Sequence, residues 1–397
     1  MNPTMNRRRF LYGSAAASAA AMSARSYGRI LGANDRVGVG VIGLGRRGTI
    51  VSAALLEDKR AHVVAVCDIY DAQTMAFLSR LPKDQPPPHS SVAYQELLSR
   101  PDVDAVLIST PDHLHVTVAT AALQAGKHVY LEKPTLHRWE DRAVLTAAAE
   151  KYKQVLQCGM QQRSGKHYQE AKQSIFAAQK LGHVVFARAV WHNFPWQQRF
   201  VPDTPMPPGL DWQLFLGPAP QVPYETVRYS SWRYFPDYGA GLLADILTHW
   251  VDVAQWMLDD AEPQTATALG GIYQLHDQRK NPDTVSAILQ YKGWNLNFES
   301  SVLSIRDEHP SVFFEGTEGT LDLSRDGYTF TPNDGHATEI SSTESLERAH
   351  TGNFLDAIVS GAKVNAPLKA GLEASLPVQM ALSSYWSQKT VTQAQLM

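Results

Sequence analysis

The chain has little cysteine, no long apolar run and no large excess of either charge. Only Cys67 and Cys158 occur among the 397 residues. Each lies in a strand-like apolar run, which predicts two buried, reduced thiols rather than a disulfide framework. The net charge of −3 gives no electrostatic reason to expect nucleic acid or an anionic membrane as a partner.

The length and composition predict two packed domains. The chain exceeds the roughly 250–300 residues at which a single core stops growing, and 44% hydrophobic with 19% charged residues is an ordinary globular balance. We predict four segments: a signal and linker over 1–33, a dinucleotide-binding domain over 34–158, an α+β substrate-binding and oligomerisation domain over 159–365, and a C-terminal helix within 366–397 that packs on the first domain.

The first 33 residues have the layout of an export signal. Arg7-Arg8-Arg9-Phe10-Leu11 precedes a weakly apolar, alanine-rich stretch over 13–22, which is too short for the roughly 20 residues that span a bilayer. A basic start before a short apolar region is typical of secretory signals, and the Arg-Arg-x-Phe-Leu core resembles a twin-arginine signal. We therefore expect the twin-arginine export machinery as a partner of the precursor, and a periplasmic or otherwise exported mature protein. The alternative is a basic, disordered N-terminus.

From residue 36 onward, strand and helix patterns alternate. Expected strands cover 37–42, 62–68, 105–109, 128–131 and 155–158, and expected helices cover 49–58, 71–80, 94–99, 115–125 and 139–152. Strands that alternate with helices at this spacing predict a parallel, doubly wound sheet of the Rossmann type.

After about residue 159 the pattern changes. A helix over 169–181 and a strand over 184–191 precede a loop-rich, aromatic stretch over 194–237 and a helix over 241–258. Further strands follow over 264–271, 284–291, 296–303, 311–315 and 320–323, and the end of the chain (352–392) is helical. This order predicts an α+β domain with an open, mostly antiparallel sheet. Such a sheet is a common pairing surface, so a homodimer or homotetramer is expected.

A glycine-rich turn follows the first predicted strand. Gly43-Leu44-Gly45-Arg46-Arg47-Gly48 spells G-x-G-x-x-G and opens a helix, whose N-terminus supplies N–H donors for a pyrophosphate. Asp68 ends the second strand, where a carboxylate accepts ribose hydroxyl hydrogen bonds and repels a 2′-phosphate. NAD is therefore favoured over NADP. Either Arg46 or Arg47 could neutralise a phosphate and permit NADP, but we expect both to be solvated. The alternative is a glycine turn that binds no ligand.

Two groups of residues suit hydride transfer from an alcohol, which needs a group that accepts the hydroxyl proton. Glu132-Lys133-Pro134 follows the strand over 128–131, so Lys133 is expected at the carboxyl edge of the sheet, where ligands of such sheets bind. Asp245 and His249 are four residues apart in one predicted helix. They should share a face, with the carboxylate orienting the imidazole. Taken alone, Lys133 also fits a solvated lysine, and His249 also fits a core histidine whose hydrogen bonds are satisfied.

These residues together carry a family resemblance. The glycine turn, Asp68, Thr110-Pro111-Asp112-His113-Leu114-His115, Glu132-Lys133-Pro134 and Asp245-x-x-x-His249 resemble the Gfo/Idh/MocA family, which includes glucose–fructose oxidoreductase and inositol dehydrogenase. The resemblance implies that Lys133 contacts the reacting hydroxyl, that His249 is the general base and that Asp245 orients substrate and histidine. It further implies a cofactor site that includes Thr110, Pro111, His113, His115 and Glu132. The exported family-109 glycosidases share the fold, and the lysine of Glu-Lys-Pro favours the oxidoreductase branch.

Other residues are candidates for substrate binding. These are Gln161 and Arg163 just after the last strand of the first domain, and the aromatic and basic residues Trp191, Trp196, Trp232, Arg233 and Tyr238. Aromatic faces with polar donors suit a sugar ring, although the same residues suit an interdomain hinge or a buried loop. His113-x-His115 has no accompanying ligand cluster, so no metal is expected.

The leading prediction is an exported NAD-dependent sugar or polyol oxidoreductase that holds its cofactor tightly, because no replenished nicotinamide pool exists outside the cytoplasm. Such an enzyme oxidises one sugar and reduces a second acceptor at the same bound nucleotide. The alternative is a glycoside hydrolase or lyase that uses bound NAD through a transient 3-keto sugar, and glycoside cleavage without net redox change would identify it. A third reading is a protein that retains the nucleotide as structure.

Overall fold

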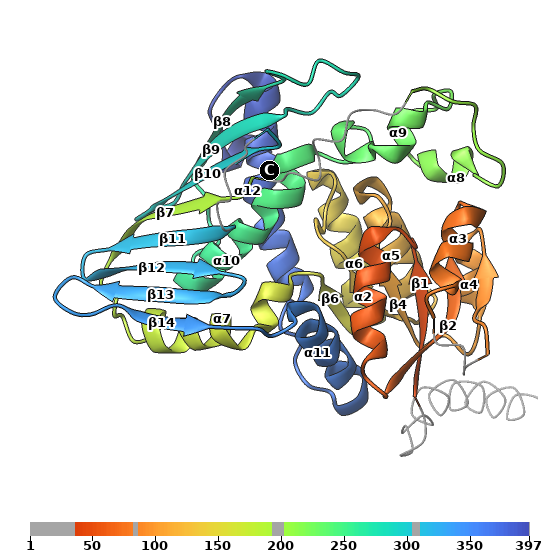
Figure 1. Cartoon of the computed structure of the whole chain (residues 1–397), viewed down its shortest axis with the longest axis horizontal. Helices are drawn as coiled ribbons and strands as arrows, with labels where there is room; N and C mark the ends of the chain where they lie inside the picture. Colours follow the sequence, from red (N-terminus) through yellow and green to blue (C-terminus); the bar gives the residue numbers. More distant parts are fainter. Residues whose placement is uncertain (1–35, 82–85, 193–201, 304–309, 397) are drawn as a thin grey trace, which may run out of the picture.

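The computed structural model describes residues 36–81, 86–192, 202–303 and 310–396. The predicted signal over 1–33 and Trp196 lie outside these ranges. Two sheets stand beside each other, each with its own helices, and the last helices of the chain run between them (Figure 1). Within the described ranges, no helix has the length and apolar character needed to span a membrane.

The first sheet is parallel, as predicted, and has six strands where five were expected. In sheet order its strands are β3 (His89–Ser91), β2 (Ala61–Cys67), β1 (Val37–Ile42), β4 (Ala105–Ile108), β5 (His128–Leu131) and β6 (Leu156–Cys158). Its helices are α2 (Arg46–Leu56), α3 (Asp71–Leu78), α4 (Tyr94–Ser99), α5 (His115–Gln124) and α6 (Arg142–Tyr152). Every residue of β1 and β4 is buried, as expected for strands covered on both faces. The strand that was not predicted is β3, a three-residue polar strand at the sheet edge.

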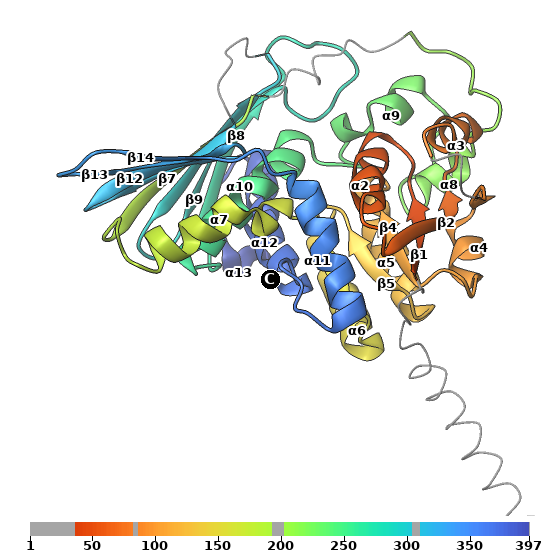
Figure 2. The ribbon, with the colours of Figure 1, turned by 60° about the horizontal axis from the view of Figure 1, so that its bottom comes forward.

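The second sheet is nine-stranded and open, and only the β7–β10 pair is parallel. In sheet order its strands are β14 (Thr338–Ser341), β13 (Gly327–Pro332), β12 (Gly319–Ser324), β11 (Ser311–Gly316), β7 (Val184–Val190), β10 (Asn295–Ser301), β9 (Thr284–Gln290), β8 (Thr265–Gly271) and β15 (Val391–Thr392). Helices α7 (Lys166–Ala171), α10 (Thr248–Leu258) and α12 (Leu368–Ser387) lie on one face (Figure 2). The predicted α+β class is confirmed, while β13, β14 and β15 were missed.

The prediction of a loop-rich stretch over 194–237 was wrong in part, because the described portion of this segment contains helices. These are α8 (Trp212–Leu216), α9 (Thr226–Ser230) and a 3₁₀ turn over Trp232–Tyr234. An aromatic cluster replaces a regular core here: Trp212 stacks on Phe215 with ring centroids 4.8 Å apart, and Phe215 packs edge-on against Tyr238. The segment is attached to the first domain, since the Asp211 N–H donates to the Ile69 carbonyl over 2.8 Å.

The end of the chain, predicted to be helical over 352–392 with a C-terminal helix within 366–397, consists of two long helices. Helix α11 (Leu346–Ser360) ends at Gly361, whose φ of 72° suits glycine, and α12 begins after Pro367. Helix α11 lies along α2 and places Phe354 and Leu355 in the core of the first domain. The start of α12 meets β6 through a backbone bridge between Gln157 and Pro367. Both helices therefore connect the domains; the last short helix, α13 (Gln393–Leu396), follows β15.

Phe354 provides a test of this connection. Its side chain is fully buried and packs edge-on against Tyr130 with centroids 5.8 Å apart. We expect Phe354→Ala to lower the free energy of unfolding by about 3–5 kcal/mol, measured by urea denaturation. Val359→Ala, at a 42% exposed position of the same helix, is the matched control and should change it by less than about 0.5 kcal/mol. Equal effects would contradict the docking of α11 on the first domain.

Candidate active site

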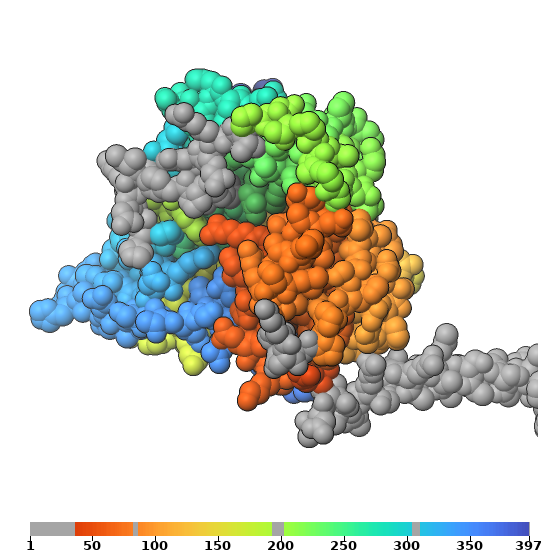
Figure 3. All heavy atoms as spheres, turned by 45° about the vertical axis from the view of Figure 1, so that its right-hand side comes forward, coloured from red at the N-terminus to blue at the C-terminus, as the bar shows by residue number. Residues whose placement is uncertain are grey.

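A cavity of about 970 Å³ extends from the glycine turn after β1 to helix α10 of the second domain. This volume is at the upper end of the roughly 300–1,000 Å³ of small-molecule sites. Both domains line it, and it opens between the first domain and the segment that carries α8 and α9 (Figure 3). The carboxyl ends of β1, β2, β4 and β5 lead into it, which is the edge where such sheets bind ligands.

The glycine turn has the shape that a pyrophosphate requires. Gly43 has a φ of 87°, and a Cβ there would come within 2.7 Å of the Ser109 backbone. A Cβ on Gly48 would lie 2.0 Å from the Gly43 carbonyl oxygen, so this glycine permits close packing of α2. A Cβ on Gly45 would meet nothing closer than a Gln73 atom at 3.9 Å. The space above Gly45 and the uncapped start of α2 therefore fit a dinucleotide phosphate.

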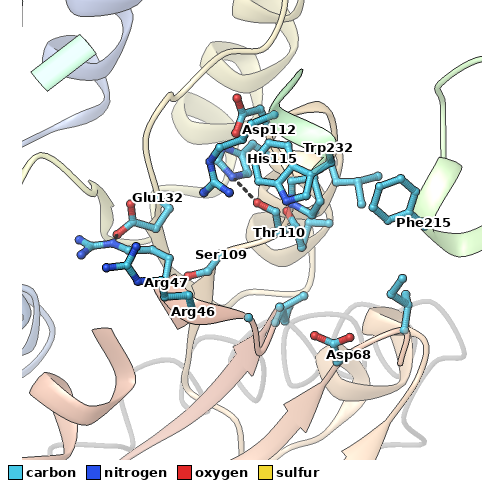
Figure 4. Close-up of a pocket in the computed structure, with 18 of the residues that line it drawn as sticks. Arg46, Arg47, Asp68, Ser109, Thr110, Asp112, His115, Glu132, Phe215 and Trp232 are labelled. Atoms are coloured by element: carbon cyan, nitrogen blue, oxygen red, sulfur yellow. Dashed lines mark hydrogen bonds and ion pairs between the residues drawn. The ribbon is translucent and has the colours of Figure 1, made fainter. Parts of the chain in front are cut away.

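Asp68 lies on the opposite side of the cavity from Glu132 and Arg47 (Figure 4). Its Oδ2 accepts a hydrogen bond from the Leu44 N–H over 2.8 Å, and Oδ1 accepts one from the Tyr70 N–H over 3.0 Å. Burial raises the pKa of Asp68 to about 6, although these hydrogen bonds oppose the shift. The carboxylate thus supports the glycine turn and also lines the cavity. Leu44 itself points into the core, so its predicted cofactor contact is limited to the backbone.

Arg47 is not the solvated residue that the sequence analysis expected. Its guanidinium donates to Glu132 Oε1 over 2.7 Å and to Glu347 Oε1 over 2.9 Å. Burial alone would lower its pKa, but the two carboxylates raise it above the ordinary value. Glu347 belongs to the first turn of α11, and it reaches Arg47 because α11 lies along α2. Arg46, by contrast, is exposed as predicted.

Lys133 and Asp245 form an ion pair between the domains. Lys133 Nζ donates to Asp245 Oδ1 over 2.5 Å and to the Asp245 carbonyl over 2.8 Å, and Arg233 Nε lies 3.6 Å from the same carboxylate. Burial alone would raise the pKa of Asp245, but the two cations outweigh it and hold the pKa below its usual value. Lys133 lies at the carboxyl edge of the sheet, and from there its ammonium contacts Asp245.

His249 lines the cavity, but its partner is not the predicted one. Its Nδ1 lies 3.2 Å from Gln162 Oε1, while Asp245 pairs with Lys133. The reason is a π-helical turn over Leu243–Leu247, which breaks the register that would place residues four apart on one face. Burial, and then the charge of Lys133, lower the pKa of His249 well below its ordinary value. The imidazole is therefore neutral at neutral pH, and with Nδ1–H donating to Gln162, Nε2 is free to accept a proton.

The structure divides the other predicted site residues into two sets. The cavity is lined by Thr110, Pro111, His115, Gln161, Trp191, Trp232 and Arg233. The predictions for three residues outside it were wrong. His113 is buried against the α8 segment with Nε2 2.9 Å from the Phe215 carbonyl, Arg163 pairs with buried Asp252 over 2.8 Å, and Tyr238 lies in the aromatic cluster.

Several cavity residues were missed. Asp112 lies inside a motif that the sequence analysis quoted, and burial raises its pKa to about 8. Arg325 and Glu347 come from a turn and a helix far along the chain, and Gln213, Leu214 and Tyr229 come from the segment predicted as a loop. No local pattern marks these residues, because only the packing of the domains brings them to the cavity. Among the residues that the structure describes, no three His, Cys, Asp or Glu side chains are grouped as a metal site would need.

Two family profiles match consecutive parts of the chain. The profile described as oxidoreductase family, NAD-binding Rossmann fold, matches residues 37–160. The profile of the GFO/IDH/MocA C-terminal domain matches residues 168–322. These segments coincide with the six-stranded sheet and with the larger part of the nine-stranded sheet.

Curated relatives match over shorter parts. The 1,5-anhydro-D-fructose reductase of Ensifer adhaerens is 30% identical over 240 residues, which are 58% of this chain and 60% of that protein. A glycosyl hydrolase family 109 protein of Shewanella sp. (strain W3-18-1) is 33% identical over 105 residues, 25% of this chain and 23% of that protein. The chain thus matches less than two thirds of the length of these relatives.

Solved structures share the whole fold. Levoglucosan dehydrogenase, solved with NADH and levoglucosan, has a TM-score of 0.70 at 18% identity over 91% of this chain and 100% of that chain. Aldose-aldose oxidoreductase from Caulobacter crescentus, complexed with glycerol, has a TM-score of 0.69 at 19% identity over 90% and 99%. This likeness concerns the fold, whereas the two profiles, which together match more than half of the chain, show that it belongs to the Gfo/Idh/MocA family of oxidoreductases, with an NAD-binding Rossmann domain followed by the family's C-terminal domain.

Proposed function

We propose that the protein transfers a hydride between a CH–OH carbon of a sugar or polyol and a bound nicotinamide. The observation that carries this proposal is the Lys133–Asp245 ion pair beside a neutral, cavity-lining His249. This arrangement supplies one hydrogen-bond donor and one proton acceptor in the same cavity as the dinucleotide-binding glycine turn. Bound NAD supplies the hydride acceptor, and the glycine turn, α2 and Asp68 are the groups that would hold it.

The side chains have separate tasks in the transfer. The Lys133 ammonium donates a hydrogen bond to the carbinol oxygen and stabilises the negative charge that develops there. Asp245 fixes the direction of that ammonium through its 2.5 Å contact. His249 Nε2 accepts the hydroxyl proton as the carbon loses its hydride, and Gln162 holds the ring through Nδ1. Trp191, whose ring centroid is 5.6 Å from that of His249, limits where a sugar can lie.

The proposal includes export and a tightly held cofactor. Export is supported by the Arg7-Arg8-Arg9-Phe10-Leu11 run. Retention is supported by the α8–α9 segment, because Tyr229 packs edge-on against Tyr70, two residues after Asp68, with centroids 6.0 Å apart. The second domain thereby covers the Asp68 end of the cavity. A retained nucleotide must be regenerated in place, so we propose that a second sugar acceptor completes the cycle. A solved structure of the same fold carries the name aldose-aldose oxidoreductase.

A second candidate is glycoside cleavage through a transiently oxidised sugar. It is favoured by the relatives named glycosyl hydrolase family 109, which match about a quarter of the chain. Oxidation at C3 would make the neighbouring C–H acidic, so that the leaving group is eliminated before the ring is reduced again. Release of the aglycone with no net change in NADH would establish this reaction instead of sugar-to-sugar transfer.

Two substitutions test the catalytic assignment. We expect Lys133→Met and His249→Asn each to lower the rate of hydride transfer by about 10²–10⁴, because each removes a group that acts on the reacting hydroxyl. Reduction of the bound nucleotide is followed at 340 nm in single turnovers with saturating donor sugar, because a closed cycle leaves no net NADH, and retained nucleotide is measured for each variant. Lys166→Met, at an 88% exposed side chain, is the control. Unchanged turnover in both variants would favour a protein that holds the nucleotide only as structure.

The raised pKa of Asp68 predicts a pH dependence of cofactor retention. The carboxyl, with a pKa of about 6, is mostly ionised at pH 7 and mostly protonated at pH 5, and only the ionised form accepts both ribose hydroxyls. We therefore expect bound NADH to dissociate up to ~10-fold faster at pH 5 than at pH 7, measured by the loss of NADH fluorescence after displacement with excess NAD. In Asp68→Asn the rate should be high at both pH values; a pH dependence that persists in this variant would show another group to be responsible.

If the nucleotide is regenerated in place by a second sugar, it should remain bound to the protein after the signal has been removed. Denaturation after extensive dialysis should release about one NAD(H) per chain, measured by absorbance and mass spectrometry. Sugars that bleach or restore the reduced band near 340 nm can then be screened directly. A purified protein that is empty and binds added NAD reversibly would instead be an ordinary dehydrogenase, and both the retained cofactor and the export proposal would be abandoned.

A further inference from the structure

Arg325 is a charged cavity residue to which the transfer mechanism assigns no task. It occupies the turn between β12 and β13 and lines the cavity. Its guanidinium lies 4.7 Å from the ring centroid of Trp191, and its Nε is buried without a hydrogen-bond partner. Within the described ranges, no hydrogen bond or ion pair engages this guanidinium. Burial lowers its pKa from the ordinary value, but arginine stays protonated in proteins.

The charges around the sugar-binding part of the cavity do not cancel. Asp245 pairs with Lys133 and neutralises it. Asp112 is 4% exposed with a pKa of about 8, and is therefore uncharged at neutral pH. His249 is neutral as well. Arg325 then adds a further positive charge. Glu347 and Asp326 act on it electrostatically, but Glu347 is paired with Arg47 and, among the residues that the structure describes, no carboxylate contacts the guanidinium. A partly buried cation without a contacting counter-ion is costly.

We infer that the substrate carries a carboxylate, which pairs with Arg325, so that the sugar is a sugar acid such as a uronate. This inference deepens the proposed function and rests on it. A guanidinium presents parallel N–H donors that match the two oxygens of a carboxylate. Stacking on Trp191 fixes the plane of the guanidinium and leaves its N–H edge for the ligand.

The position of Arg325 connects this anchor to the reacting groups. The Trp191 ring contacts Arg325 and lies 5.6 Å from the ring of His249. Arg325 is also close enough to His249 to lower its pKa. A sugar whose carboxylate is bound at Arg325 therefore extends along Trp191 towards His249 and Lys133. The carboxylate fixes which ring hydroxyl meets these two groups, so Arg325 selects both the substrate and the carbon that reacts.

Two other anions fit less well. The cofactor pyrophosphate belongs at the start of α2 beside Gly45, and Arg47 in that helix is already paired with Glu132 and Glu347. A sugar phosphate carries about −1.5 to −2 charge at pH 7, more than one unpaired guanidinium compensates. A carboxylate carries one negative charge and leaves Arg325 neutralised.

The test compares sugar acids with their neutral counterparts on the holoprotein. Titration calorimetry gives Kd for D-glucuronate against D-glucose, and for D-galacturonate against D-galactose, in wild type, Arg325→Gln and Arg142→Gln. Arg142 is the matched control, because its guanidinium also stacks on a tryptophan, Trp139, at 4.5 Å, but lies outside the cavity. We expect an acid to bind about 10–100-fold more tightly than its neutral counterpart in wild type and in Arg142→Gln, and this preference to disappear in Arg325→Gln.

The remaining outcomes overturn the inference or isolate it from the proposed function. Equal affinity for acids and neutral sugars in wild type would overturn it, as would tighter binding of D-glucose 6-phosphate than of D-glucuronate. Faster loss of NADH from Arg325→Gln would assign the arginine to the cofactor instead. Hydride transfer is measured separately by absorbance at 340 nm. Oxidation of neutral sugars without a preference for acids would contradict the inference alone. Binding of an acid that depends on Arg325, without hydride transfer, would contradict the oxidoreductase proposal alone.

Discussion

The ion pair between Lys133 of the first domain and Asp245 of the second is the interaction on which the site depends. Two charges taken out of water are tolerated only when their geometry is good, and removal of one partner from such a pair costs about 3–5 kcal/mol. Arg47 and Glu347 make a second pair across the same interface. The surface that holds the domains together is therefore also the surface that supplies the chemistry, and domain packing and catalytic geometry cannot vary independently.

The π-helical turn over Leu243–Leu247 explains how one helix serves both partners. In a regular α-helix Asp245 and His249 would lie on one face and compete for the same contact. The wider turn separates them, so that the carboxylate meets Lys133 while the imidazole meets Gln162. Both residues were predicted from the sequence, but the contact between them was not, because spacing alone does not reveal a π-turn. Such turns frequently mark functional sites.

The fold was largely predictable because its signals are local. Short β-branched runs such as that of β1, glycine turns and helix periodicity identified the parallel sheet, while the three-residue β3 and the helices α8 and α9 were too short to give a pattern. The site was predictable where a motif marks it, as with Asp68 and Lys133 at strand ends and with the Asp-x-x-x-His pair of Asp245 and His249. Arg47 was misjudged and Arg325 and Glu347 were missed, since their partners lie up to 300 residues away in the sequence.

The electrostatics of the cavity connect substrate binding to proton transfer. Burial and the charges of Lys133, Arg325 and Arg47 lower the pKa of His249, so the imidazole is a weak base before a substrate binds. A carboxylate paired with Arg325 cancels one of these three charges and raises the pKa of His249 towards the working pH, where a general base is most effective. A neutral sugar does not produce this change. An anionic substrate would thus be favoured twice, once in binding and once in the basicity of the residue that accepts its proton.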